Sequence, residues 1–107
     1  MDWTIVYTKE ALRDIKALDG SQRKQVLKAI EKVATNPFPN SEGGYGKPLG
    51  NHLTSNLSGY LKIKLLKLGF RVVYAIERVD GVMKIIIISV RDDEEVYRMA
   101  YERINRP

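Results

Sequence analysis

Apolar and polar positions along the first third of the chain follow two different periods. Residues 2–7 repeat every two positions, with Trp3, Ile5 and Tyr7 on one side, and this predicts a β-strand. Apolar positions then recur every three or four residues over 9–18 and again over 22–34. This spacing predicts two amphipathic helices that form a hairpin.

The link between the two helices contains residues that often end or begin a helix. We expect Gly20 to end the first helix in a left-handed conformation and Ser21 to cap the second. After the second helix comes a long segment rich in Gly, Pro, Asn and Ser, residues 36–59. We interpret this segment as one irregular loop, and loops of such length are usually functional or mobile.

The period of two returns in three stretches, residues 60–66, 70–77 and 83–90. Short turns join these stretches, so they predict a three-stranded antiparallel meander. The third stretch contains four consecutive isoleucines, which is typical of a strand that is buried on both faces. We therefore expect it to lie in the centre of the sheet.

A short C-terminal helix is predicted to begin after Asp92 or Asp93, either of which can cap it. The order of elements predicts one α+β domain over residues 1–107. We expect the N-terminal strand to complete a four-stranded sheet beside the isoleucine-rich strand. The helical hairpin is expected to cover one face of this sheet, which leaves the other face available for a partner or a substrate.

Composition excludes several kinds of chemistry. The 107 residues include no cysteine, so disulfides, thiol nucleophiles and iron–sulfur clusters are excluded. No apolar run approaches the ~20 residues that span a bilayer, and residues 1–10 do not resemble a secretory signal. We therefore expect a cytoplasmic protein that does not enter the membrane.

The charge is positive, with 18 Lys and Arg against 13 Asp and Glu, a net charge of +5. Much of this excess lies in residues 60–78. Lys62 and Lys64 alternate with apolar residues and so share one face of their strand. Such a face can bind phosphates, or it can simply keep a hairpin in contact with water. The candidate RNA-binding residues are Lys62, Lys67, Arg71 and Arg78.

No metal or cofactor site is predicted. Residues 43–47 contain glycines and a lysine like a phosphate loop, but Pro48 stands where a magnesium-binding Ser or Thr is required. The acidic residues at 92–95 are explained by the start of a helix, where negative charge is favourable. We therefore expect no cofactor.

Several short motifs occur in order along nearly the whole chain. They are Ile5-Val6-Tyr7, Gly46-Lys47-Pro48-Leu49, Leu61-Lys62-Ile63-Lys64, Gly69-Phe70-Arg71-Val72-Val73-Tyr74, Val90-Arg91 and Glu95-Val96-Tyr97. Together they resemble the RelE/ParE superfamily of toxins from bacterial toxin–antitoxin modules, and the RelE branch more closely than the ParE branch.

The resemblance implies a function and a set of partners. RelE-type toxins cut messenger RNA in the decoding site of the ribosome, whereas ParE-type toxins poison DNA gyrase. The expected partners are a small acidic antitoxin, the ribosome with its message, and operator DNA through the antitoxin alone. The alternatives are a gyrase inhibitor of the ParE type and a degenerate member that only binds its antitoxin. The catalytic residues of the RelE type fall on Lys62, Lys64, Arg71, Arg91 and Tyr97.

The implied reaction is attack of a ribose 2′-hydroxyl on the adjacent phosphate, without a metal. It needs a base, an acid and positive charge around the phosphate. The only histidine, His52, lies in the predicted loop, so a lysine is the expected base. We assign the base to Lys64, phosphate binding to Lys62 and Arg71, the leaving oxygen to Arg91, and contact with an RNA base to Tyr97.

Overall fold

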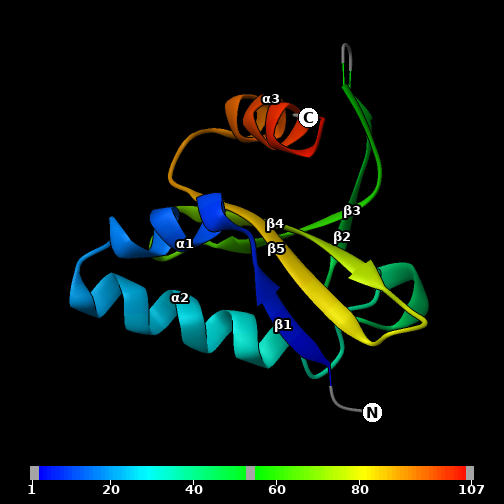
Figure 1. The fold of residues 1–107 in the computed structure, drawn as a ribbon, viewed down its shortest axis with the longest axis horizontal. Coiled ribbons are helices and arrows are strands. Elements are labelled where there is room, and N and C mark those ends of the chain that lie inside the picture. The colour runs from blue at the N-terminus through cyan, green and yellow to red at the C-terminus, as the bar shows by residue number, and fades with distance from the viewer. Residues whose placement is uncertain (1–2, 53–54, 106–107) are drawn as a thin grey trace.

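The structure is a computed structural model that describes residues 3–52 and 55–105. Its helices and strands follow the predicted order, with two additions, a short 3₁₀ helix and a strand, between the second helix and the meander (Figure 1). The elements are β1 (Thr4–Tyr7), α1 (Lys9–Lys16), α2 (Gly20–Val33), the 3₁₀ helix η1 (Asn40–Glu42), β2 (Lys47–His52), β3 (Ser55–Leu65), β4 (Phe70–Glu77), β5 (Val82–Ser89) and α3 (Asp93–Ile104).

The strands form one mixed sheet in the order β1-β5-β4-β3-β2. β1 pairs with β5 in parallel, and the other neighbours are antiparallel. The predicted α+β class is confirmed, as are the meander and the position of β1 beside the isoleucine-rich strand. The predicted number of four strands is wrong, because β2 adds a fifth strand at the edge.

The segment 36–59 is not the irregular loop that the sequence predicted. Its described residues include η1, β2 and the first part of β3. β2 contains Pro48 and Gly50, which are poor strand formers, so its local pattern does not indicate a strand. Pairing with β3 supplies the hydrogen-bonding partner, and the edge position tolerates a proline that cannot donate.

The link between α1 and α2 also differs from the prediction. Asp19, rather than Ser21, is the N-cap of α2, and its side chain accepts a hydrogen bond of 2.8 Å from the backbone of Gln22. The Gln22 side chain bonds back to the backbone N–H of Asp19, which completes a capping box. Gly20 therefore becomes the first residue of the helix and does not adopt the left-handed conformation.

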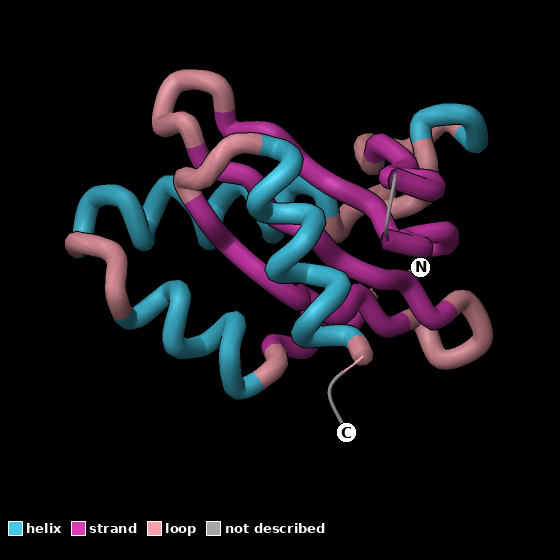
Figure 2. The backbone as a smooth tube through the Cα atoms, turned by 90° about the horizontal axis from the view of Figure 1, so that it is seen from above, coloured by secondary structure: helices cyan, strands magenta, loops and turns pink. Residues whose placement is uncertain are grey.

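Two apolar cores lie on opposite faces of the sheet. Under the helical hairpin, Ala11, Ile15, Val26 and Ile30 pack against one face of the sheet, as predicted. On the other face, α3 crosses the strands (Figure 2). Its buried residues Val96, Tyr97 and Ala100 meet Val73, Ile86 and Ile87.

The sequence analysis expected the second face to be open. This expectation is wrong, because α3 covers part of the face. The apolar stripe of α3 has to be buried, and this face of the sheet is the surface that it covers. The start of α3 lies beside β3 and β4, because Asp93 contacts Lys64 and Arg71. The first two turns of α3 thus form one wall of any site on this face.

The C-terminal half of α3 is held by Arg103. Its guanidinium donates to both carboxylate oxygens of Asp14 on α1, at 2.7 and 3.0 Å, and to the carbonyl of Ile86 at 2.9 Å. Asp14 also accepts the backbone N–H of Ile88 at 3.0 Å. The Arg103–Asp14 pair therefore provides hydrogen-bond partners for the backbone carbonyl of Ile86 and the backbone N–H of Ile88. Both groups lie beyond the part of β5 that pairs with β1.

Arg103→Met is expected to lower the free energy of unfolding by about 3 kcal/mol, because it leaves the largely buried Asp14 carboxylate without its partner. Urea denaturation measures the change. Arg98→Met is the matched control, with the same substitution on the same helix. Arg98 is 60% exposed and pairs only with other α3 residues, so its loss should change stability by less than about 1 kcal/mol. Equal effects of the two substitutions would contradict this account.

Candidate functional site

Asp93 is the first residue of α3 and lies over strands β3 and β4. The preceding residue, Asp92, is the N-cap, since its side chain accepts the backbone N–H of Glu95 at 2.9 Å. The cap therefore does not use the Asp93 carboxylate. That carboxylate instead faces the cations of the sheet.

Three cations from two strands converge on Asp93. Lys64 Nζ lies 2.9 Å from Oδ2 and Lys62 Nζ lies 3.8 Å from the same oxygen. Arg71 Nε donates to Oδ1. The register explains the convergence, because Lys62 and Lys64 are alternate residues of β3, and Arg71 on β4 stands directly opposite Lys64.

Tyr97 completes the group one helical turn after Asp93. Its hydroxyl accepts a hydrogen bond from Lys62 Nζ, which also lies 5.0 Å from the centre of the tyrosine ring. We call Lys62, Lys64, Arg71, Asp93 and Tyr97 the Asp93 cluster. One carboxylate faces three cations, so the cluster keeps an excess of positive charge.

Arg91 contacts the Asp93 cluster through its backbone, while its guanidinium pairs with a residue outside the cluster. Its backbone carbonyl accepts a hydrogen bond of 2.8 Å from Arg71 Nη1. Its side chain is 55% exposed, and its guanidinium pairs with Glu95, near the start of α3, at 2.7 Å. The exposed pair contributes little to stability, so little holds the side chain in this position.

The surroundings change the ionisation of the Asp93 cluster. Partial burial alone raises the pKa of the Asp93 carboxyl, but hydrogen bonds from Lys64 and Arg71 and the nearby lysine charges outweigh it and bring this pKa to about 2. Burial lowers the pKa of Lys62, and the charges of Lys64 and Arg71 add to this, although Asp93 opposes it. Burial and the charge of Asp93 raise the pKa of Tyr97.

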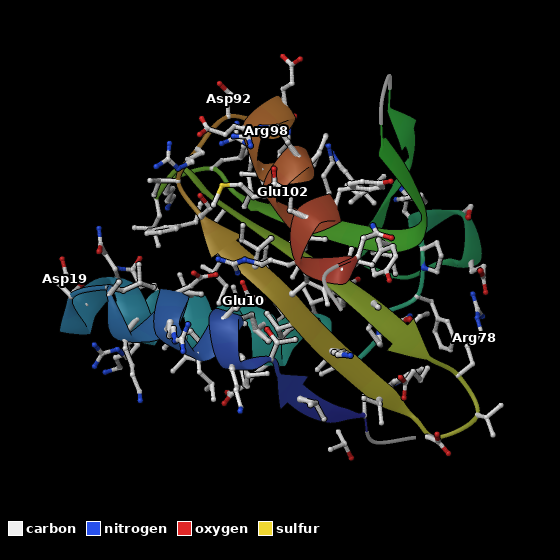
Figure 3. The ribbon with its side chains drawn as sticks, turned by 45° about the horizontal axis from the view of Figure 1, so that its top comes forward. Glu10, Asp19, Arg78, Asp92, Arg98 and Glu102 are labelled. Carbon is white, nitrogen blue, oxygen red and sulfur yellow. The ribbon has the colours of Figure 1, made fainter. Side chains whose placement is uncertain are left out.

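Two of the predicted RNA-binding residues lie outside the Asp93 cluster. Arg78 pairs with Glu42 through two contacts of 2.8 and 2.7 Å, and its guanidinium lies over the ring of Phe38. Figure 3 shows Arg78 at the opposite end of the molecule from Asp92, which precedes Asp93. Lys67 lies in the turn after β3, where it lines a surface groove against α2.

Sequence reasoning missed Asp93 as a member of the site. Its position at a helix start was explained by capping, a role that belongs to Asp92. One feature of the sequence could have indicated it. Three cations on adjacent strands repel one another, and this favours an acidic side chain nearby. The side chain of His52 is not among those that the structure describes. Within the described ranges, no group of three metal-binding side chains occurs and no helix is long and apolar enough to cross a membrane.

The fold and the Asp93 cluster define a small basic α+β protein with three cations gathered around one carboxylate on the face of its sheet. Residues 5–97 match the family model for the ParE toxin of type II toxin–antitoxin systems. The chain therefore belongs to this family, within the RelE/ParE superfamily, and it is a RelE-like toxin of the type II class.

Individual proteins that are similar to this chain support the same family. The chain is 26% identical over 104 residues to a RelE-like toxin protein of Escherichia coli, covering 97% of this chain and 99% of the relative. Its fold is similar to a free double mutant of the E. coli toxin RelE, with a TM-score of 0.73 and 25% identity over 97% and 99% of the two chains. The same mutant in complex with a peptide of the antitoxin RelB gives a TM-score of 0.69 at 24% identity, over 94% and 95% of the two chains.

Asp93→Asn is expected to lower the melting temperature at neutral pH, because three cations then face no carboxylate. The pKa of Asp93 in the folded protein is about 2, below its ordinary value of 3.8. The carboxylate thus stabilises the fold fully above about pH 4, and this stabilisation is lost as the pH falls towards 2. Calorimetry should show that the difference in melting temperature between wild type and Asp93→Asn narrows as the pH falls from about 4 towards 2.

Asp92→Asn is the control for this measurement. It makes the same change of charge at the neighbouring residue, and Asn caps a helix about as well as Asp does. Its melting temperature should stay close to that of wild type. A gap between wild type and Asp93→Asn that is unchanged from neutral to acidic pH would contradict the role given to the ion pairs.

Proposed function

We propose that this protein is a ribosome-dependent endoribonuclease that cuts messenger RNA in the decoding site and so inhibits translation. The convergence of Lys62, Lys64 and Arg71 beside Tyr97 supports the proposal. Several cations at one point suit a phosphate that gains negative charge as a 2′-hydroxyl attacks it. The products of this step are a cyclic phosphate and a free 5′-hydroxyl.

Each residue of the site has a proposed role. Lys62 and Arg71 hold the phosphate, Arg91 stabilises the leaving 5′-oxygen, and Tyr97 contacts a base of the message. A base must lose its proton near neutral pH, and nearby cations favour this loss. Lys64 is the base that the sequence suggested, beside Lys62 and Arg71. The lowered pKa of Lys62 supports Lys62 as an alternative base at the same phosphate.

Dependence on the ribosome follows from the type of residues in this set. Lysines and arginines hold their protons more tightly than histidine does, so they transfer protons poorly at neutral pH. A message held by the ribosome in a bent conformation brings the 2′-oxygen and the phosphate together before the toxin binds. Part of the barrier is then overcome by the geometry of the substrate.

Arg71→Ala is expected to reduce cleavage by about 10²–10³-fold, as for the loss of one fixed donor to a transition-state charge. Primer extension on programmed ribosomes measures new 5′ ends within the decoding-site codon. Arg78→Ala is the control, since Arg78 pairs with Glu42 away from the Asp93 cluster. It should leave the rate at saturating ribosome concentration unchanged. A role of Arg78 in RNA binding would appear as a weaker apparent affinity alone.

Absence of cleavage by folded, antitoxin-free protein would overturn this proposal. The family model that matches is that of ParE toxins, and this observation favours inhibition of DNA gyrase as the second candidate. A supercoiling assay with purified gyrase separates the two. Growth arrest that survives the double substitution Lys64→Ala, Arg71→Ala would support the gyrase candidate.

The proposed partner in the cell is a small acidic antitoxin, and operator DNA is bound only through it. The similar structures include complexes of RelE proteins with RelB antitoxins, which supports this part of the proposal. A net charge of +5 should speed association with an acidic partner at low salt. Stopped-flow mixing with the cognate antitoxin should show an association rate that falls steeply with added salt. A rate independent of salt would contradict an acidic partner.

A further inference from the structure

The phosphate-binding groups of the proposed site are already bound to an anion of the same chain. Arg71 contacts Oδ1 of Asp93, and Lys64 and Lys62 lie at 2.9 and 3.8 Å from Oδ2. Both oxygens of the carboxylate are therefore used, as two oxygens of a phosphate would be. No phosphate can contact the same three cations at full strength while Asp93 remains between them.

We propose that Asp93 is a specificity-determining residue that competes with the substrate, and that a phosphate of the nucleic acid binds by displacing its carboxylate from Lys62, Lys64 and Arg71. The inference rests on the proposed function, since it gives the Asp93 cluster a phosphate as its ligand. It adds a residue that the cationic set of the family does not contain, and it assigns to that residue an effect on binding rather than on the chemical step.

Displacement is possible because Asp93 does not cap α3. The N-cap of α3 is Asp92, so movement of the Asp93 side chain does not uncap the helix. The Asp93 side chain is 36% exposed, which leaves it a path towards water. The rest of α3 stays in place, because Val96 and Ala100 are buried and Arg103 is bound to Asp14.

The cations would exchange one anion for another of the same charge. A phosphate diester has a full negative charge on its free oxygens, and its contacts with Arg and Lys are charge-assisted in the same way. The first turn of α3 favours either anion, since helix N-termini carry partial positive charge. The balance is therefore set by concentration. Asp93 is always present beside the cations, whereas a free nucleic acid must reach them from solution.

Competition of this kind selects for substrates that are delivered at high local concentration. A free strand binds weakly, because each encounter must first break the ion pairs of Asp93. A message that the ribosome holds against the toxin remains beside the cations and has time to replace the carboxylate. Asp93 thus adds a reason for ribosome dependence that is separate from the bent geometry of the message.

The test measures binding and needs neither ribosomes nor cleavage. The probe is a short fluorescein-labelled single-stranded DNA, which lacks the 2′-hydroxyl and cannot be cut by the proposed reaction. Fluorescence anisotropy gives its dissociation constant for wild type, Asp93→Asn and the control Asp92→Asn over a range of salt concentrations. Both variants change the net charge equally, but Asp93 contacts the three cations whereas Asp92 caps α3, a role that Asn also fills.

We expect Asp93→Asn to bind the probe about tenfold more tightly than wild type does. The salt dependence should also steepen by up to about 0.7 in log–log slope, because binding to wild type frees a carboxylate that offsets the charge of one phosphate, and the variant has no such carboxylate. Asp92→Asn should stay within about twofold of wild type. Equal tightening in both variants would reduce the effect to net charge and overturn the proposal, as would no tightening in Asp93→Asn.

A second measurement uses the wild-type protein and so does not depend on the folding of a variant. The ¹³C resonance of the Asp93 carboxyl is followed while the unlabelled DNA is added. It should move towards the position of a solvated carboxylate, with the same dissociation constant as the anisotropy. A resonance that stays fixed while the DNA binds would overturn the displacement.

The outcomes separate this inference from the proposed function. Cleavage on the ribosome together with unchanged binding by Asp93→Asn would refute the competition and leave the nuclease proposal standing. Tighter binding by Asp93→Asn in a protein that cuts no message would support the competition and refute the nuclease.

Discussion

The contact between Asp93 and the three cations is the interaction on which the site depends. Lys62, Lys64 and Arg71 stand on one face of two adjacent strands, with Arg71 directly opposite Lys64. Their repulsion requires either a bound anion or an acidic side chain. Asp93 supplies the acid in the free protein, and it does so from a helix whose place is set by other contacts.

Those other contacts are apolar packing and one buried ion pair. α3 covers the second face of the sheet through Val96, Tyr97 and Ala100, and Arg103 ties its far end to Asp14. The sheet and α3 are therefore rigid relative to each other, while the ion pairs at the start of α3 are partly open to water. A rigid frame with exchangeable ion pairs can bind an anion without a change of fold.

The membership of the chain in the ParE toxin family and its similarity to RelE structures leave two activities, cleavage of messenger RNA and inhibition of gyrase, to be separated by the site. An inhibitor of gyrase needs a binding surface, but it does not need cations and a tyrosine at one point. The Asp93 cluster has this arrangement, with Arg91 beside it. The chemistry of these residues, more than the shared fold, therefore supports the nuclease over the gyrase inhibitor.

The sequence by itself determined the parts of this protein that depend on local order. The period of two placed Lys62 and Lys64 on one face of a strand, and the helical period predicted the hairpin and its buried face. The resemblance to the RelE type indicated Tyr97 as a residue of the site, and the structure places it against Lys62. Only the tertiary structure decided the rest. Pro48 and Gly50 form a strand because β3 provides its partner, and no local pattern contains that pairing.

Arg78 bears the same charge as Arg71 and lies only seven residues later, yet the sheet takes it to the far end of the molecule. Asp93 meets Lys62 and Arg103 meets Asp14 across long stretches of chain. Such contacts are set by the packing of the whole molecule, since residues far apart in sequence meet only where the folded elements bring them together.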